Sequence, residues 1–184
     1  MVLRRLRHSA QERLRRSRRD AAQFAGQQQS WGIEIAAAIR PTSAWKFWGN
    51  FAYVDARYAD YVFAGGSFSG NTPPNVPRIV ANAGVSYRFA TALPVELGAS
   101  VRHVGNRFNT DANTVTLDAY TVADAYVFVD IPKSVFQAVD QTRLTFRVRN
   151  LTDKRYAIWG DPFYPDQILL GAPRTYEVSA AFKW

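Results

Sequence analysis

The stretch that decides the fold is the last one in the chain, residues 175–184, which read TYEVSAAFKW. Apolar and other side chains alternate in it, and one face holds only apolar residues: Tyr176, Val178, Ala180, Phe182 and Trp184. Successive side chains of a β-strand point to opposite faces, so a period of two predicts a strand with one apolar face.

The same alternation recurs upstream and predicts about seven strands in all. The further segments are residues 33–39, 47–53, 81–89, 93–101, 119–131 and 142–150. Residues 119–131 leave the assignment of faces open, because Asp124 shares a face with Val122, Tyr126 and Phe128.

One of these segments indicates what surrounds the strands. In residues 142–150, Arg143, Arg147 and Arg149 share the face opposite the apolar one. An arginine that faces lipid at the bilayer midplane costs about 2–4 kcal/mol, so in a membrane these three must face a watery interior.

The connections between the predicted strands alternate in length. Residues 41–43 and 90–92 are short, whereas residues 64–77, 108–118 and 157–173 are long; residues 132–140 are intermediate. Tight turns on one side and large loops on the other are typical of outer-membrane β-barrels. We therefore predict an all-β fold, an antiparallel transmembrane β-barrel segment whose chain ends at the periplasmic rim.

The charge of the chain is concentrated at its start. The whole chain has 23 basic and 15 acidic residues, a net charge of +8. Residues 1–20 contain eight arginines and two acidic residues, which leaves 15 basic and 13 acidic residues, or +2, for the remainder. We predict that residues 1–30 form a basic arm, either disordered or a spurious start, and that nucleic acid is not a partner.

This arm is not a targeting segment of a common kind. It is followed by polar residues rather than by the apolar run of a secretory signal. The apolar run at residues 35–39 is far below the roughly 18 residues of a membrane-spanning helix.

No enzyme chemistry is predicted. The chain has no cysteine, which excludes thiol catalysis and thiolate metal sites. Residues 65–69 begin like a nucleophile elbow but have Ser69 where glycine is needed, and the residues around His103 show no triad spacing. We assign no catalytic, cofactor or metal residue.

Five stretches carry a resemblance to a known family. They are NLTDKRY (150–156), GAPRT (171–175), NVPR (75–78), VRHVGNRF (101–108) and YVDARY (53–58). In their order along residues 31–184 they resemble the C-terminal barrel of TonB-dependent outer-membrane receptors, most closely the siderophore receptors. The NLTDKRY stretch is interpreted as a structural motif at a strand end rather than as a ligand contact.

The resemblance implies a barrel of about 22 strands that is closed by an N-terminal plug. Residues 31–184 would then be its C-terminal portion, located in the bacterial outer membrane and incomplete by itself. They would supply about a third of the strands, as expected of a split or frameshifted gene. The complete receptor would import a ferric siderophore, with iron already chelated, and contact the TonB complex only through the missing plug. The alternative is a small self-closing barrel of about eight strands with a structural or adhesive role, which needs one more strand from residues 1–30.

Two groups of residues are candidate sites under this resemblance. Tyr176, Val178, Phe182 and Trp184 resemble the C-terminal signal that the barrel-assembly machinery recognises, although the family usually ends in Phe; the alternative role is an aromatic girdle in contact with outer-membrane lipid. Trp159, Phe163 and Tyr164 lie in the last long loop, where they either face a ligand or pack on one another.

Overall fold

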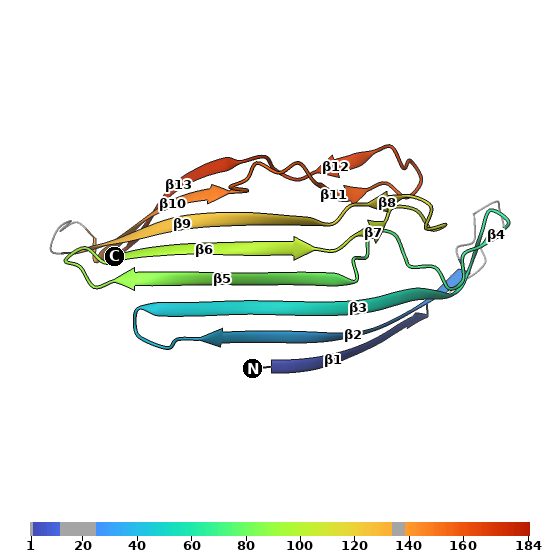
Figure 1. Cartoon of the computed structure of the whole chain (residues 1–184), viewed down its shortest axis with the longest axis horizontal. Helices are drawn as coiled ribbons and strands as arrows, with labels where there is room; N and C mark the ends of the chain where they lie inside the picture. The colour runs from blue at the N-terminus through green and yellow to red at the C-terminus, as the bar shows by residue number, and fades with distance from the viewer. Residues whose placement is uncertain (1, 12–24, 134–138) are drawn as a thin grey trace.

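The computed structural model describes residues 2–11, 25–133 and 139–184. Its main element is one antiparallel sheet with the strand order β1-β2-β3-β5-β6-β9-β10-β13 (Figure 1). The long strands are β1 (Val2–Gln11), β2 (Ala25–Ile39), β3 (Trp45–Phe63), β5 (Ile79–Phe89), β6 (Val95–Val104), β9 (Tyr120–Pro132), β10 (Gln141–Arg149) and β13 (Thr175–Lys183). Short strands occur in the loops: β4 (Gly66–Ser67), β7 (Arg107–Phe108), β8 (Thr116–Leu117), β11 (Ala157–Gly160) and β12 (Ile168–Leu170).

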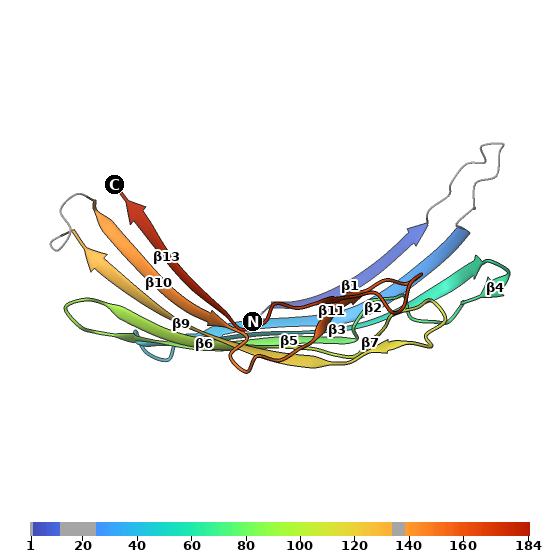
Figure 2. The same cartoon turned by 90° about the horizontal axis from the view of Figure 1, so that it is seen from above.

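The sheet is curved like a section of a barrel wall (Figure 2). Its outermost strands, β1 and β13, pair with β2 and β10 on one side only, and they do not pair with each other within the described residues. The prediction of an all-β, antiparallel and incomplete barrel is therefore confirmed. No helix long and apolar enough to cross a membrane occurs in the part of the chain that the structure describes.

All seven predicted strands are present, as β2, β3, β5, β6, β9, β10 and β13. The structure contains strands within the predicted basic arm: β2 begins at Ala25, and Val2–Gln11 form β1. Residues 12–24 of the arm lie outside the described residues. The division into an arm and a barrel portion otherwise stays a prediction.

The early start of β2 has a physical reason. Its first residues pair with the far half of β3, as in Gln28 opposite Tyr58. Strand β3 pairs with β5 only over Trp45–Tyr53, so this far half extends beyond the wall toward the loops. A strand beyond the wall does not need an apolar face toward lipid, and the period of two is lost in residues 25–30.

The pairing register gives the sheet two chemically different faces. One rung across seven strands contains only apolar residues: Ile39, Phe47, Val85, Ala99, Ala125, Val148 and Tyr176. A neighbouring rung on the other side contains Lys46, Ser86, Gly98, Tyr126, Arg147 and Glu177. We call these sides the apolar face and the polar face.

The register also settles the ambiguous strand β9. Its apolar face carries Ala123, Ala125, Val127 and Val129, and its polar face carries Val122, Asp124, Tyr126 and Phe128. The aromatic rings on the polar face have space because a glycine lies beside them on the neighbouring strand. A Cβ atom on Gly98 would overlap the ring of Tyr126, and one on Gly84 would overlap Trp48.

Large apolar side chains are exposed all along the apolar face. Leu97 is 43% exposed, Phe146 47% and Val178 73%. Aromatic pairs mark both margins of this face: Trp45 and Tyr87, with ring centroids 4.8 Å apart, lie near the short turns, and Trp31 and Tyr53, at 5.5 Å, lie toward the loops. A continuous apolar surface with aromatic margins is the outer surface of a membrane barrel.

Candidate functional site

The two ends of the sheet differ in their connections. At the short-turn end lie residues 40–44 and 90–94 and the C-terminus; at the long-loop end lie residues 64–78, 105–119 and 150–174 (Figure 1). The polar face between these ends, together with the long loops, is the candidate site.

Near the short-turn end, the polar face carries ion pairs. The carboxylate of Asp130 accepts hydrogen bonds from Nε of Arg143 at 2.6 Å and from Nη2 of the same side chain at 2.9 Å. Nη2 of Arg88 lies 3.3 Å from the same carboxylate, and Nε of Arg88 lies 3.7 Å from Glu96. Burial of a carboxylate beside two guanidinium groups is favourable because each charge has a partner.

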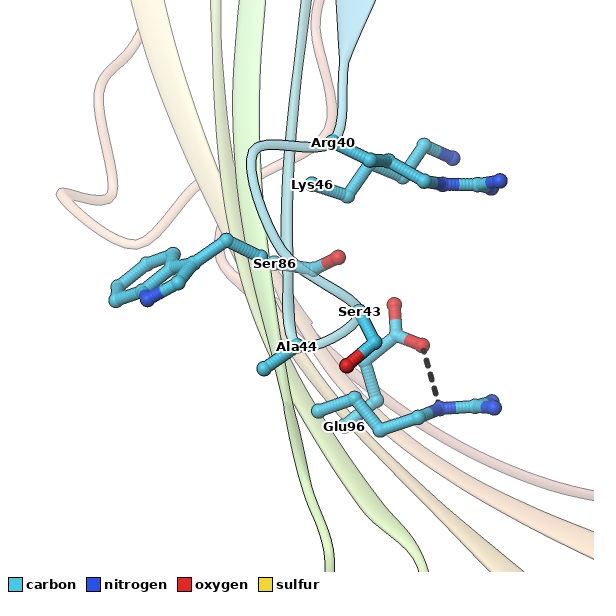
Figure 3. Close-up of a pocket in the computed structure, with 8 residues that line it drawn as sticks. Arg40, Ser43, Ala44, Lys46, Ser86 and Glu96 are labelled. Carbon is cyan, nitrogen blue, oxygen red and sulfur yellow. Dashed lines mark ion pairs between the residues drawn. The ribbon is translucent and has the colours of Figure 1, made fainter.

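A cavity of about 420 Å³ opens beside this network. Figure 3 shows Arg40 and Lys46 extending to the same side of the turn as Glu96, and a dashed line marks the ion pair between Glu96 and Arg88, which also lines the cavity. Ser86, on β5, is buried in its wall. The cavity is therefore polar, and its cations are either paired or open to solvent.

The three arginines of β10 lie as predicted. They occupy the polar face, and each has a carboxylate partner: Arg143 pairs with Asp130, while Arg149 and Arg147 lie 2.6 and 3.8 Å from Glu177 of β13. These pairs join neighbouring strands of the wall, which is a structural role.

At the long-loop end, asparagine side chains join loops that are far apart in the sequence. Asn75 donates from Nδ2 to the carbonyl of Gly160 at 2.8 Å, and its Oδ1 accepts from the Gly160 amide at 2.9 Å. Asn113 makes the same pair of bonds with the backbone of Thr72, at 2.7 and 2.9 Å. Both asparagines have positive φ, a conformation that asparagine tolerates better than most residues.

A carboxylate joins one of these loops to strand β3. The phenol of Tyr58 donates to Oδ1 of Asp111 at 2.6 Å, and the phenol of Tyr61 donates to Oδ2 at 3.4 Å. Both tyrosines lie on the part of β3 beyond the wall. Burial, reinforced by the hydrogen bond to Asp111, raises the pKa of Tyr58, so this phenol remains a donor.

The NLTDKRY stretch forms a similar link at the start of the last long loop. Oδ1 of Asn150 accepts from the amide of Lys154, and its Nδ2 donates to the carbonyls of Lys154 and Ala172. The Asn150 amide donates to Asp124 of the polar face at 2.9 Å. The motif fixes the path of the chain where it leaves β10, as its structural interpretation predicts.

Between the wall and the long loops lies a groove of about 480 Å³ with cationic and aromatic walls. Tyr120 is one of its lining residues: its ring lies 4.3 Å from that of Tyr156, and the guanidinium carbons of Arg102 and Arg107 lie 5.9 and 5.8 Å from its centroid. Arg107 is buried, and its Nη2 donates to the carbonyl of Ala157 at 2.7 Å. Burial lowers the pKa of Arg107, because the charged form loses hydration.

The predicted loop residues are exposed. Trp159 is 43% exposed, Phe163 60% and Tyr164 64%. Oδ1 of Asp161 accepts from the amides of Phe163 and Tyr164, so a turn brings these two together, and the ring of Phe163 lies edge-on to Phe63 at 6.1 Å. Contact of the three residues with a ligand stays a prediction.

The predicted assembly residues share the outer surface of β13. Tyr176, Val178 and Phe182 point to the apolar face, and Trp184 follows them at the end of the chain with 86% exposure. This arrangement is compatible with an assembly signal and with an aromatic girdle, and the signal stays a prediction.

The two residues weighed for enzyme chemistry have other surroundings. Ser67 lies in β4, after a turn with positive φ at Ala64 and Gly65, and not at a strand-to-helix junction. His103 is on the apolar face, where its Nδ1 lies 2.9 Å from Oγ1 of Thr121. The described residues contain no group of three or more His, Asp or Glu arranged to hold a metal ion.

The sequence predicted no role for the groups that make the loop links and line the groove: Asn75, Asp111, Asn113 and Tyr120. The sequence contains only a weak signal for these links. Asparagine and aspartate are common in turns because their side chains bond to nearby backbone, but the sequence does not show which distant loop they reach.

Comparison with known proteins places this arrangement among outer-membrane receptors. The family described as "TonB dependent receptor-like, beta-barrel" matches residues 13–151. The ferrichrome outer membrane transporter/phage receptor of Escherichia coli is 27% identical over 161 residues, covering 86% of this chain and 20% of that protein. The ferrioxamine receptor of Yersinia enterocolitica is 26% identical over 132 residues, covering 72% and 18%.

Solved structures share the fold. The ferric preacinetobactin receptor BauA of Acinetobacter baumannii superposes with a TM-score of 0.72 at 22% identity, over 97% of this chain and 26% of that one. The unliganded ferric citrate transporter FecA gives a TM-score of 0.69 at 23% identity, over 84% and 24%. The chain spans about a fifth of the length of the curated relatives it matches.

Proposed function

This chain belongs to the β-barrel family of TonB-dependent receptors, and from this premise we propose that it forms the C-terminal part of the wall of an outer-membrane receptor for a ferric siderophore. The observation that carries the proposal is the two-faced sheet, with a continuous apolar face for lipid and an ion-paired polar face for the lumen. Relatives named as ferrichrome and ferrioxamine receptors supply the substrate class.

In this proposal the chain has a wall's role in transport. Its polar face contacts the plug, its long loops and the groove around Tyr120 line the entry path, and its apolar face contacts outer-membrane lipid. The barrel-assembly machinery inserts it, and the TonB complex acts through the plug. None of these roles requires the chain to be an enzyme.

A chimaeric receptor tests the proposal. The part of the E. coli ferrichrome transporter that matches this chain is replaced by residues 25–184, and uptake of radioactive ferric ferrichrome is measured in cells that lack other ferrichrome uptake. We expect the chimaera to assemble in the outer membrane and to import iron only when TonB is present. Assembly without TonB-dependent uptake of ferrichrome or ferrioxamine would contradict the proposal.

The alternative of a small self-closing barrel gains one observation, since β1 supplies an eighth long strand. It requires β1 to pair with β13, which the described residues do not show. Expression of the 184-residue chain alone separates the two proposals. A closed barrel migrates on a gel in a heat-modifiable form and resists protease, whereas a wall segment does neither.

A further inference from the structure

A small cavity with only cationic, polar and apolar walls lies at the foot of the long loops. Its volume is about 130 Å³, and its polar lining comes from Thr72, Arg78, Asn106, Arg107 and Thr116. No carboxylate is among the lining residues. Two arginines with hydroxyl and amide donors around one small space form a lining suited to an anion.

Arg107 is the residue that makes this cavity unusual. Its side chain is 4% exposed, its Nη2 donates to the carbonyl of Ala157, and its Nη1 is buried with no hydrogen-bond partner. Within the residues that the structure describes, no carboxylate forms an ion pair with it. The ring of Tyr120 attracts the guanidinium but supplies no countercharge.

A buried charge without a countercharge is costly, whereas a paired one is tolerated. The wall shows the contrast directly, because Arg143, Arg147 and Arg149 all have carboxylate partners. Arg78 also lines the cavity and, unlike Arg107, is exposed; it shares with Arg107 the absence of an ion pair among the described residues. The cavity therefore combines two positive charges with no negative one.

We propose that this cavity binds a phosphate-type oxyanion, held by the guanidinium groups of Arg107 and Arg78 and by the hydroxyls of Thr72 and Thr116. The planar fork of a guanidinium matches two oxygens of a phosphate, and the anion supplies the missing charge. At about 30 Å³ for each water molecule, the cavity has room for about four waters, which is enough for one phosphate group. The phosphate is either free in solution or part of a lipid headgroup at the membrane surface.

The test is a calorimetric titration of the full chain with inorganic phosphate. The chain is kept in a maltoside detergent, which contains no phosphate. Circular dichroism first verifies the β-structure of each variant. We expect saturable binding that Arg107→Gln and Arg78→Gln each weaken by about tenfold or more, the usual effect of removing a charge-assisted hydrogen bond. Arg57→Gln is the matched control, because Arg57 lies at the same end but pairs with Asp55, and it should leave the affinity unchanged.

A second arm uses vesicles of phosphatidylcholine with and without phosphatidic acid, which carries a phosphate monoester. If the chain binds phosphatidic acid vesicles and Arg78→Gln abolishes this binding, the phosphate comes from a lipid. If the chain binds only inorganic phosphate, the ligand is a free anion. Either result supports the site. If Arg107→Gln does not fold, Arg78→Gln alone tests the site, because the Arg78 side chain is exposed and its replacement should not disturb folding. No saturable binding of either probe, or equal weakening by Arg57→Gln and Arg78→Gln, would overturn the proposal.

Discussion

The wall and the long-loop end of this molecule are held together in different ways. In the wall, most positions of the apolar face carry apolar side chains at every second residue, and the strands are joined by a regular ladder of backbone hydrogen bonds. In the long loops, single side chains such as Asn75, Asp111 and Asn113 each join two distant segments. The difference teaches that the wall depends on a pattern, whereas the loops depend on individual residues.

The largest effect is expected where the pattern itself is broken. Val127→Arg places a charge at the middle of the apolar face of β9. It should destabilise the chain in lipid vesicles by about 2–4 kcal/mol, because the guanidinium would face hydrocarbon. Urea unfolding followed by tryptophan fluorescence measures this change. Ser179→Arg, on the exposed polar face of β13, is the control and should cost almost nothing; equal losses would mean that the two faces are not chemically distinct.

One position of the wall depends on an individual residue, as the loops do. In Gly98→Ala, the new methyl group would overlap the ring of Tyr126. We expect a loss of about 1–3 kcal/mol in the same unfolding measurement, typical of an overpacked site. Gly98→Ala combined with Tyr126→Ala removes the overlap, so the two changes should cost less together than the sum of their separate effects. Additive losses would show that the ring does not occupy this space.

A smaller and more local effect is expected in the loops. Asn75→Ala removes two hydrogen bonds to the backbone of Gly160 and should cost about 1–2 kcal/mol. Hydrogen exchange at the Gly160 amide should accelerate, while exchange in β5 and β6 stays unchanged. Asn75→Gly also lacks the side-chain amide, but glycine adopts a positive φ without strain. The difference in stability between Asn75→Ala and Asn75→Gly therefore measures the backbone strain alone. Faster exchange throughout the wall would contradict the division into wall and loops.

The smallest effect is expected at the short-turn end. Nζ of Lys133 lies 2.6 Å from Asp140, but both side chains are more than half exposed. Lys133→Ala should change the free energy of unfolding by less than about 1 kcal/mol, because solvent screens exposed ion pairs. The urea midpoint measures it, and a shift as large as that of Gly98→Ala would show that this turn is more than a connector.

The strands of the wall could be predicted from the sequence because burial on one face leaves a period of two in residues 33–39, 81–89 and 175–184. Strand β9 could not be assigned to a face, because its Tyr126 lies over Gly98 of β6 on the polar face, and this depends on register. The strand structure of Val2–Gln11 and of residues 25–30 was not predicted, since strands without an apolar face leave no alternation.

The candidate site was less predictable than the wall. Arg143, Arg147 and Arg149 could be placed on the polar face because three cations separated by even numbers of residues share one face of a strand, and that face cannot be in lipid. Arg107 could not be distinguished from them by sequence, since its burial depends on contacts with residues 50 and 13 positions away, Ala157 and Tyr120. Contacts over such distances carry no local signature.

The central claim is that the apolar face contacts lipid and the polar face contacts water. The chain has no cysteine, so single cysteines can be introduced one at a time along residues 122–129 and spin-labelled in outer-membrane-like vesicles. The account predicts that labels at 123, 125, 127 and 129 are accessible to oxygen dissolved in lipid, and that labels at 122, 124, 126 and 128 are accessible to a water-soluble nickel complex. Accessibility to the nickel complex at all eight positions, without a period of two, would contradict it.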